Sequence, residues 1–210
     1  MLGEIKMSNY VFDLIGVEKK PSRKGRQKLK MTIKADLSKL DKAHFLKWSA
    51  KYDKEHPWWV EQEKILGDQL RKSKSYDRLF LEQVLEWKFK TVQMWRDINI
   101  ERLRSVPDLK ISLSSNRFFE TEDTSSKINT LKMDGIGVSV ASTVLTFLDP
   151  SKYCIHDTHV WRRVYGGDAK GIHTLNHYLK LLSDLRDVSV RVSLPVRTVE
   201  KALFKEDFDS

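Results

Sequence analysis

The chain has 210 residues, a formal net charge of +9 at pH 7 and one cysteine, Cys154. This length allows one domain with a core of its own, and a single cysteine excludes an internal disulfide. Because no apolar run approaches the roughly 18 residues of a membrane-spanning helix and the first residues lack a signal-peptide pattern, we expect a cytoplasmic protein with no membrane partner.

Apolar residues recur at helical spacing along most of the chain, which predicts an all-α fold. Residues 9–17 form an apolar cluster that suits either a short helix or a strand. The helices predicted beyond this cluster span residues 38–54, 57–72, 75–98 as one helix or two, 126–131, 138–147, 158–165, 173–187 and 195–205. Residues 106–122 carry mixed helix and loop signals, and no element is assigned to them.

Much of the positive charge lies near the N-terminus, in residues 19–34. This segment holds eight basic residues and no acidic one, namely Lys19, Lys20, Arg23, Lys24, Arg26, Lys28, Lys30 and Lys34. Such a segment is either a solvated arm or a contact along a phosphate backbone. We therefore divide the chain into a basic N-terminal arm with a short apolar segment, residues 1–36, and a helical domain, residues 37–210.

Residues 126–147 predict two helices joined by a short hairpin. Gly135 and Gly137 flank Ile136, so the backbone there can adopt a positive φ and approach a partner that a Cβ would keep away, while Ile136 points inward. The helix that starts at Val138 presents unpaired N–H groups and the positive end of its dipole, which suit a phosphate. An ordinary glycine-containing turn between two core helices is the alternative.

This hairpin and the stretch around Asp157 together resemble the helix-hairpin-helix DNA glycosylases, a superfamily that includes endonuclease III and the adenine and alkylated-base glycosylases. The shared pattern is a leucine, a Gly-hydrophobic-Gly turn, a helix of small residues and a hydrophobic-Asp-Thr-His-hydrophobic-x-Arg stretch. The residues at that pattern, or within one position of it, are Leu131, Gly135, Ile136, Gly137, Ala141, Asp157, Thr158, His159, Val160 and Arg163. The match covers residues 128–166. It implies a helical bundle of this family, with two lobes beside a cleft as an open alternative.

Two departures from the best-known members narrow the chemistry that the resemblance implies. Bifunctional members carry a lysine two positions after the second hairpin glycine, where this chain has Ser139, and a serine cannot form a Schiff base. The resemblance therefore implies hydrolytic base removal without efficient lyase activity at the abasic site, with Lys88 or Lys132 as an alternative amine. Endonuclease III also holds an iron–sulfur cluster on four cysteines, which one cysteine cannot bind. The resemblance also leaves open whether a monovalent cation, K⁺ or Na⁺, binds at the hairpin.

Asp157 is the candidate catalytic residue. Cleavage of an N-glycosidic bond develops positive charge on the sugar, and a fixed carboxylate stabilises that charge or orients the attacking water. A unit charge pair at about 4 Å in an effective dielectric of about 20 is worth roughly 4 kcal/mol. The alternative is that Asp157 serves only as the N-cap of the helix that follows, a role worth about 1 kcal/mol.

We expect further DNA contacts around these two motifs. The expected DNA-binding residues are Lys132, Gly135, Ile136, Gly137, Ser139, His159 and Arg162. Because DNA glycosylases hold a flipped base between apolar or aromatic walls, Trp87, Lys88 and Trp161 are candidates for a base pocket. Core packing is the alternative for the tryptophans, and a surface position is the alternative for Lys88. His156 and His159 flank Asp157, but the sequence offers no second ligand cluster, so no metal site is expected.

The resemblance and the positive charge together predict a monomeric, nucleoid-associated protein that binds double-stranded DNA. The first candidate function is a monofunctional DNA glycosylase of base excision repair, a hydrolase that removes a damaged or modified base. The second is a noncatalytic helix-hairpin-helix DNA-binding protein that recognises lesions or structured DNA. Asp157 favours the first function, and the missing hairpin lysine removes only the lyase step.

Overall fold

The computed structural model describes residues 37–167, 169 and 171–210. These residues form ten α-helices and one 3-10 turn, Leu37–Lys39, with no strand among them. The helices are α1 Lys42–Glu55, α2 Pro57–Ser73, α3 Arg78–Lys88, α4 Gln93–Arg104, α5 Asp108–Glu120, α6 Thr124–Leu131, α7 Val138–Leu148, α8 Thr158–Tyr165, α9 Leu175–Val192 and α10 Val196–Phe208. The predicted all-α class is confirmed. The arm and the apolar cluster predicted within residues 1–36 lie outside the described residues.

Aspartate is the N-cap residue, directly before the first helical residue, of four of these helices. The carboxylates of Asp41, Asp77 and Asp123 each accept the backbone N–H three residues later, at 2.8, 2.8 and 2.7 Å. The carboxylate of Asp157 accepts the N–H of His159 at 2.9 Å. Such a residue satisfies an amide that the helix itself leaves unpaired. Because Asp157 is one of these caps, the start of α8 holds its carboxylate in a defined direction.

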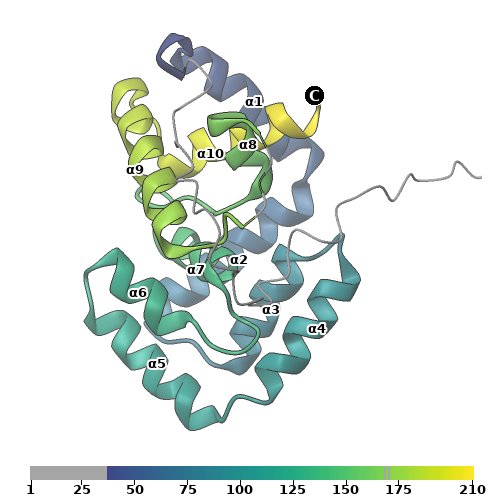
Figure 1. Ribbon diagram of the computed structural model, residues 1–210, viewed down its shortest axis with the longest axis vertical. Coiled ribbons are helices and arrows are strands. Elements are labelled where there is room, and N and C mark those ends of the chain that lie inside the picture. Colours follow the sequence, from purple (N-terminus) through teal and green to yellow (C-terminus); the bar gives the residue numbers. More distant parts are fainter. Residues whose placement is uncertain (1–36, 168, 170) are drawn as a thin grey trace, which may run out of the picture.

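α7 is the most buried helix and occupies the centre of the fold. Of residues 138–147, all except Ser139 are buried, and the helix packs against α2, α3, α6 and α9. A second group forms around α10, on which α1, α8 and α9 pack; these four helices make up the upper half of the view in Figure 1. The separation of these groups into two lobes with a cleft stays a prediction.

A tight turn joins α6 to α7. The N–H of Ile136 donates to the carbonyl of Met133 at 2.8 Å, and the N–H of Met133 donates to the carbonyl of Ile136 at 3.2 Å. Gly135 has φ +84°, which glycine adopts at little cost, and Ile136 is buried. Residues 124–148 therefore form two helices joined by a glycine hairpin with an inward isoleucine, as the sequence predicts.

The predicted helices agree with the observed ones to within a few residues at most ends, and α8 agrees at both. The segment 75–98, predicted as one helix or two, contains α3 and the first half of α4 with a break at residues 89–92, and α4 continues six residues past the predicted end. Residues 106–122, unassigned from the sequence, contain the regular helix α5. None of the described helices combines the length and the apolarity that a bilayer crossing requires.

Candidate functional site

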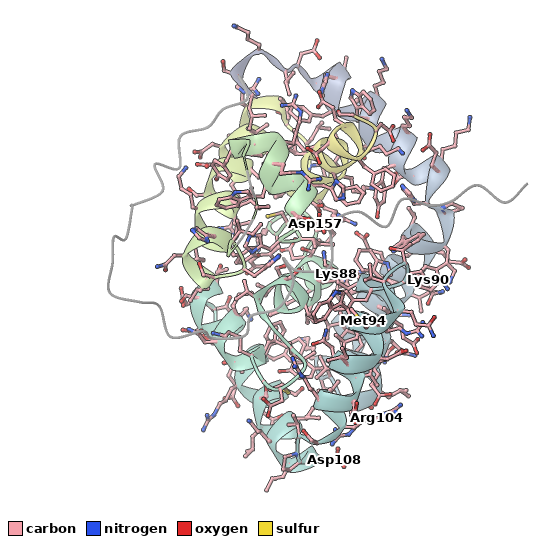
Figure 2. The ribbon with its side chains drawn as sticks, turned by 45° about the vertical axis from the view of Figure 1, so that its right-hand side comes forward. Lys88, Lys90, Met94, Arg104, Asp108 and Asp157 are labelled. Carbon is pink, nitrogen blue, oxygen red and sulfur yellow. The ribbon has the colours of Figure 1, made fainter. Side chains whose placement is uncertain are left out.

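Asp157 forms an ion pair with Lys88. The Nζ of Lys88, at the end of α3, donates to Oδ2 of Asp157 at 2.9 Å, and the two side chains are only 10% and 19% exposed. Figure 2 shows the two residues one above the other on the same side of the molecule. Since Oδ1 of Asp157 accepts the N–H of His159, each carboxylate oxygen has a donor of its own. The surface position that was the alternative for Lys88 is wrong.

The pair fixes the charge of Asp157. Burial by itself would raise the pKa of this carboxyl, but the ammonium of Lys88, the ring of His159 and the hydrogen bonds from Lys88 and the His159 amide hold the pKa well below its usual range. Asp157 is therefore ionised at neutral pH. Its negative charge is balanced at short range by Lys88, which reduces the field that it exerts on a substrate.

Ser139 connects the hairpin helix to the segment before Asp157. Its hydroxyl donates to the carbonyl of His156 at 2.8 Å, and the N–H of His156 donates to the hydroxyl of Ser142 at 2.8 Å. Two side chains of α7 thus hold the backbone of His156 on both its polar groups. The hydroxyl proton of Ser139 is used inside the fold, so this residue acts by positioning the start of α8.

The two hairpin glycines have different roles. A Cβ on Gly135 would collide with the carbonyl oxygen of Asn99 and lie 2.9 Å from the N of Leu103, both in α4. The close backbone approach at Gly135 is therefore an internal contact with α4. Gly137 is exposed, and a Cβ on it would meet nothing within 4 Å. Among the residues that the structure describes, no side chain caps α7, which begins directly after Gly137, and phosphate binding by the first amides of α7 stays a prediction.

The other two predicted hairpin contacts, Lys132 and Ile136, differ in exposure. Lys132 is exposed at the end of α6. Ile136 is 2% exposed, so its side chain cannot contact a ligand. Only its backbone atoms could do so. The carbonyls of Met133 and Ile136 already accept each other's amide, and K⁺ or Na⁺ at this turn stays a prediction that no step below uses.

His159 and Arg162 meet a carboxylate of α10. Nδ1 of His159 lies 2.9 Å from Oδ2 of Asp207, and Nη2 of Arg162 donates to the same oxygen at 2.7 Å. Nη2 of Arg162 also lies 3.0 Å from Nδ1 of His159. The structure brings these two predicted DNA-binding residues together, and it adds Asp207, which the sequence does not suggest. The carboxylate lowers the positive charge that the pair offers to a phosphate.

The two tryptophans proposed for a base pocket belong to the core. Trp87 is 4% exposed and Trp161 is 1% exposed. The indole N–H of Trp87 donates to the carbonyl of Trp59 at 2.8 Å, and the indole N–H of Trp59 donates to the carbonyl of Trp87 at 3.1 Å, which joins α2 to α3. Core packing, the alternative interpretation, holds for both. Of the three pocket candidates, only Lys88 faces Asp157.

A buried charge cluster close to this site was not predicted from the sequence. Arg197 pairs with Glu200 and with Glu63, the latter at 2.7 Å, and the side chains of Arg197 and Glu200 are 5% and 2% exposed. Glu200 also accepts the N–H of Ile155 at 3.4 Å. The spacing of Arg197 and Glu200, three residues apart and among the apolar positions of one helix, is the one signal that the sequence offered. Among the described residues, no three His, Cys, Asp or Glu side chains lie together in a way that could hold a metal ion.

Comparison of the chain with models of protein families, with curated proteins and with solved structures finds no match.

Proposed function

We propose that the protein binds double-stranded DNA as a monomer and hydrolyses the N-glycosidic bond of a damaged or modified base. The observation that supports this most is the ionised carboxylate of Asp157, held by two donors at the start of α8 and linked through His156 and Ser139 to the hairpin helix. In this proposal the hairpin grips the sugar-phosphate backbone through the exposed turn at Gly137, and the carboxylate acts on the sugar.

The chemistry assigned to Asp157 is electrostatic. As the bond to the base lengthens, positive charge develops on the deoxyribose, and Asp157 stabilises this charge or orients the water that attacks the sugar. Lys88 is a positioning residue that aims Oδ2 and keeps the carboxyl ionised. No lyase step is assigned, because the hairpin position that carries the amine in bifunctional relatives is Ser139.

The central test compares the native chain with Asp157→Asn on duplexes that each carry one altered base. Abasic products are revealed by alkali cleavage, and duplex affinity is measured in parallel. Asparagine retains the N-cap but not the charge, so we expect base release to be lost and duplex affinity to stay within about twofold. Asp77→Asn, which changes the equivalent cap of α3, is the matched control and should leave both unchanged.

Two further variants separate chemistry from folding. Asp157→Asn leaves the ammonium of Lys88 with no carboxylate partner, which costs stability, whereas Asp157→Asn combined with Lys88→Met removes both charges. We expect the double variant to recover stability but not base release. Lys88→Met alone should raise the pKa of Asp157, because burial is then opposed only by His159, and should move the acidic limb of the activity profile to higher pH. An unchanged profile would contradict the role given to Lys88.

The noncatalytic DNA-binding protein is the second candidate, and one observation favours it. Both oxygens of Asp157 are already used, one as a helix cap and one in the ion pair with Lys88, which is what a purely structural carboxylate would show. If no altered base is released while the native chain still binds duplexes, this candidate replaces the first.

A further inference from the structure

An open groove lies between α5 and α6 and reaches the first residues of the hairpin. These two helices pack side by side at the lower left of Figure 1, and the groove encloses about 730 Å³. Leu109 and Leu113 form its apolar wall and are 72% and 50% exposed. Because they lie one helical turn apart, the two leucines form one contiguous apolar patch on the open side of the groove.

The rim of this α5–α6 groove is positively charged. Lys110 and Arg117 line it from α5, and Lys132 lines it from the end of α6. All three residues are exposed, and no described residue that lines the groove carries a carboxylate. Leu109, Lys110, Leu113 and Arg117 lie at helical spacing, so one face of α5 carries both the leucines and the cations.

Two hydrogen bonds, one buried and one partly buried, hold the floor of the groove. The hydroxyl of Ser114 donates to the carbonyl of Thr130 at 2.6 Å and joins α5 to α6. The hydroxyl of Tyr76 lies 2.6 Å from the same serine oxygen, which leaves the tyrosine as the donor of that second bond. A surface fixed in this way loses little conformational freedom when a ligand binds.

We propose that the α5–α6 groove binds an acidic amphipathic helix of a partner protein. Apolar side chains of that helix, spaced by three and four residues, cover Leu109 and Leu113, and its carboxylates pair with Lys110, Arg117 and Lys132. A nucleic acid strand suits the groove less well. No described lining residue is aromatic, so bases have no ring to stack on, and a phosphate backbone gains nothing from the leucines. This docking surface goes beyond the proposed function and depends on neither Asp157 nor Gly137.

The test is selection of a displayed library of random peptides, each about four helical turns long, on the native chain. Enriched peptides are then synthesised and their affinities measured. We expect enriched sequences to place Leu, Ile or Met on one helical face and Asp or Glu beside it. Lys110→Glu combined with Arg117→Glu, and separately Leu113→Ser, should each lower the affinity of these peptides by about tenfold or more.

Matched controls carry the same changes elsewhere. Lys64→Glu combined with Lys72→Glu reverses two exposed charges on α2, and Val190→Ser removes an apolar side chain that is 80% exposed on α9. Both should bind the selected peptides like the native chain. The proposal is overturned if nothing is enriched, if enriched peptides lack acidic residues, or if they bind the groove variants as tightly as the native chain. It is also overturned if the groove variants weaken binding to an undamaged duplex instead, which would assign the groove to nucleic acid.

Discussion

At the scale of single residues, the two hairpin glycines separate a role in folding from the proposed role in DNA binding. Gly135 combines a φ of +84° with close contact to the backbone of α4. Gly137 has φ −91° as the N-cap of α7 and open space where a Cβ would stand. A motif of two glycines around an isoleucine gives no hint of this difference, because it depends on α4, which lies about thirty residues earlier in the chain.

We expect Gly135→Ala to destabilise the fold by about 2 kcal/mol or more, since alanine adds both an unfavourable φ and a steric clash. Gly137→Ala should cost less than about 1 kcal/mol, the usual penalty for alanine at an N-cap. Urea unfolding of the two variants and the native chain measures both values. If hairpin amides bind phosphate, Gly137→Ala should still weaken duplex binding. Equal stabilities for the two variants would contradict the contact assigned to Gly135.

His156 is a buried histidine whose ring nitrogens have no hydrogen-bond partner among the described residues. Burial, helped by the charges of His173 and Lys88, lowers its pKa to about 3. The unfolded chain takes up this proton near pH 6.5, while the folded chain excludes it. The unfolded state therefore binds more protons between these two values, and the stability that neutral His156 contributes falls as the pH drops through this window.

For this residue we expect a loss of about 1.4 kcal/mol of unfolding free energy per pH unit below pH 6.5, ending near pH 3. His156→Phe keeps a ring beside Trp161 and Tyr178 but does not titrate. The measurement is urea unfolding at pH 7 and pH 5, where the decrease should be smaller for the variant than for the native chain. The comparison uses the change with pH, so a constant packing cost does not affect it. Parallel decreases would show that His156 titrates normally.

At the scale of elements, helix ends were predictable where the signal is local. Aspartate caps and prolines mark the starts of α2, α3, α6, α8 and α10, and such signals act within one turn of the helix. α1 begins after the cap Asp41, four residues later than the start predicted at residue 38. α5 was missed although Pro107 precedes its start, because Ser112, Ser114 and Ser115 favour helix weakly. Its helix is supported from outside, as Ser115 accepts the N–H of Tyr76 at 2.8 Å and Ser114 bonds to α6.

The contrast between local signals and contacts from distant parts of the chain also explains which residues of the candidate site were predicted. Asp157 was found from its neighbours in the sequence, whereas its partner Lys88 lies 69 residues earlier and no local pattern links the two. Trp87 and Trp161 are of the residue type expected in a pocket wall, but the packing of several helices decides whether a ring faces the core or a cleft. Composition therefore suggested which residue types to consider, and only tertiary contacts assigned their places.

The ion pairs of Arg197 make α10 a second centre of the fold. This guanidinium binds Glu63 of α2 and Glu200 of its own helix, and Lys201 of the same helix pairs with Asp53 of α1 at 2.6 Å. Burial raises the pKa of Glu200, and Arg197 opposes that rise. Arg197 is thus the cation that pairs with the buried carboxylate of Glu200, and the same guanidinium binds Glu63.

We expect Arg197→Met to destabilise the fold by about 3 kcal/mol or more, because it leaves two carboxylates near the core without their partner. Arg104→Met is the control, since Arg104 is 65% exposed in its ion pair with Glu82 and an exposed pair contributes little. Chemical denaturation of both variants measures the difference. A small effect at Arg197 would mean that the fold tolerates these two carboxylates without their cation, and α10 would then not be fixed by these charges.

At the scale of the whole molecule, positive charge is distributed very unevenly. Residues 19–34 contain eight basic residues and no acidic one, while the formal net charge of the entire chain is +9. The rest of the chain is therefore close to neutral. Its cations at the candidate site are balanced by carboxylates, as Lys88 is by Asp157 and Arg162 is by Asp207. Long-range attraction to a polyanion must then come mainly from the N-terminal segment.

This charge distribution makes salt dependence the sharpest measurement on the whole chain. For every phosphate that the arm no longer neutralises, the slope of log affinity against log salt should become shallower by about 0.9 for a duplex. We expect the joint replacement of Lys19, Lys20, Lys28 and Lys30 by Gln to lower that slope and weaken duplex binding at low salt. The same replacement at the exposed Lys42, Lys54, Lys64 and Lys72 removes an equal charge and should change the slope much less. Equal slopes for the two sets would mean that net charge alone, and not an arm along the phosphates, governs attraction to DNA.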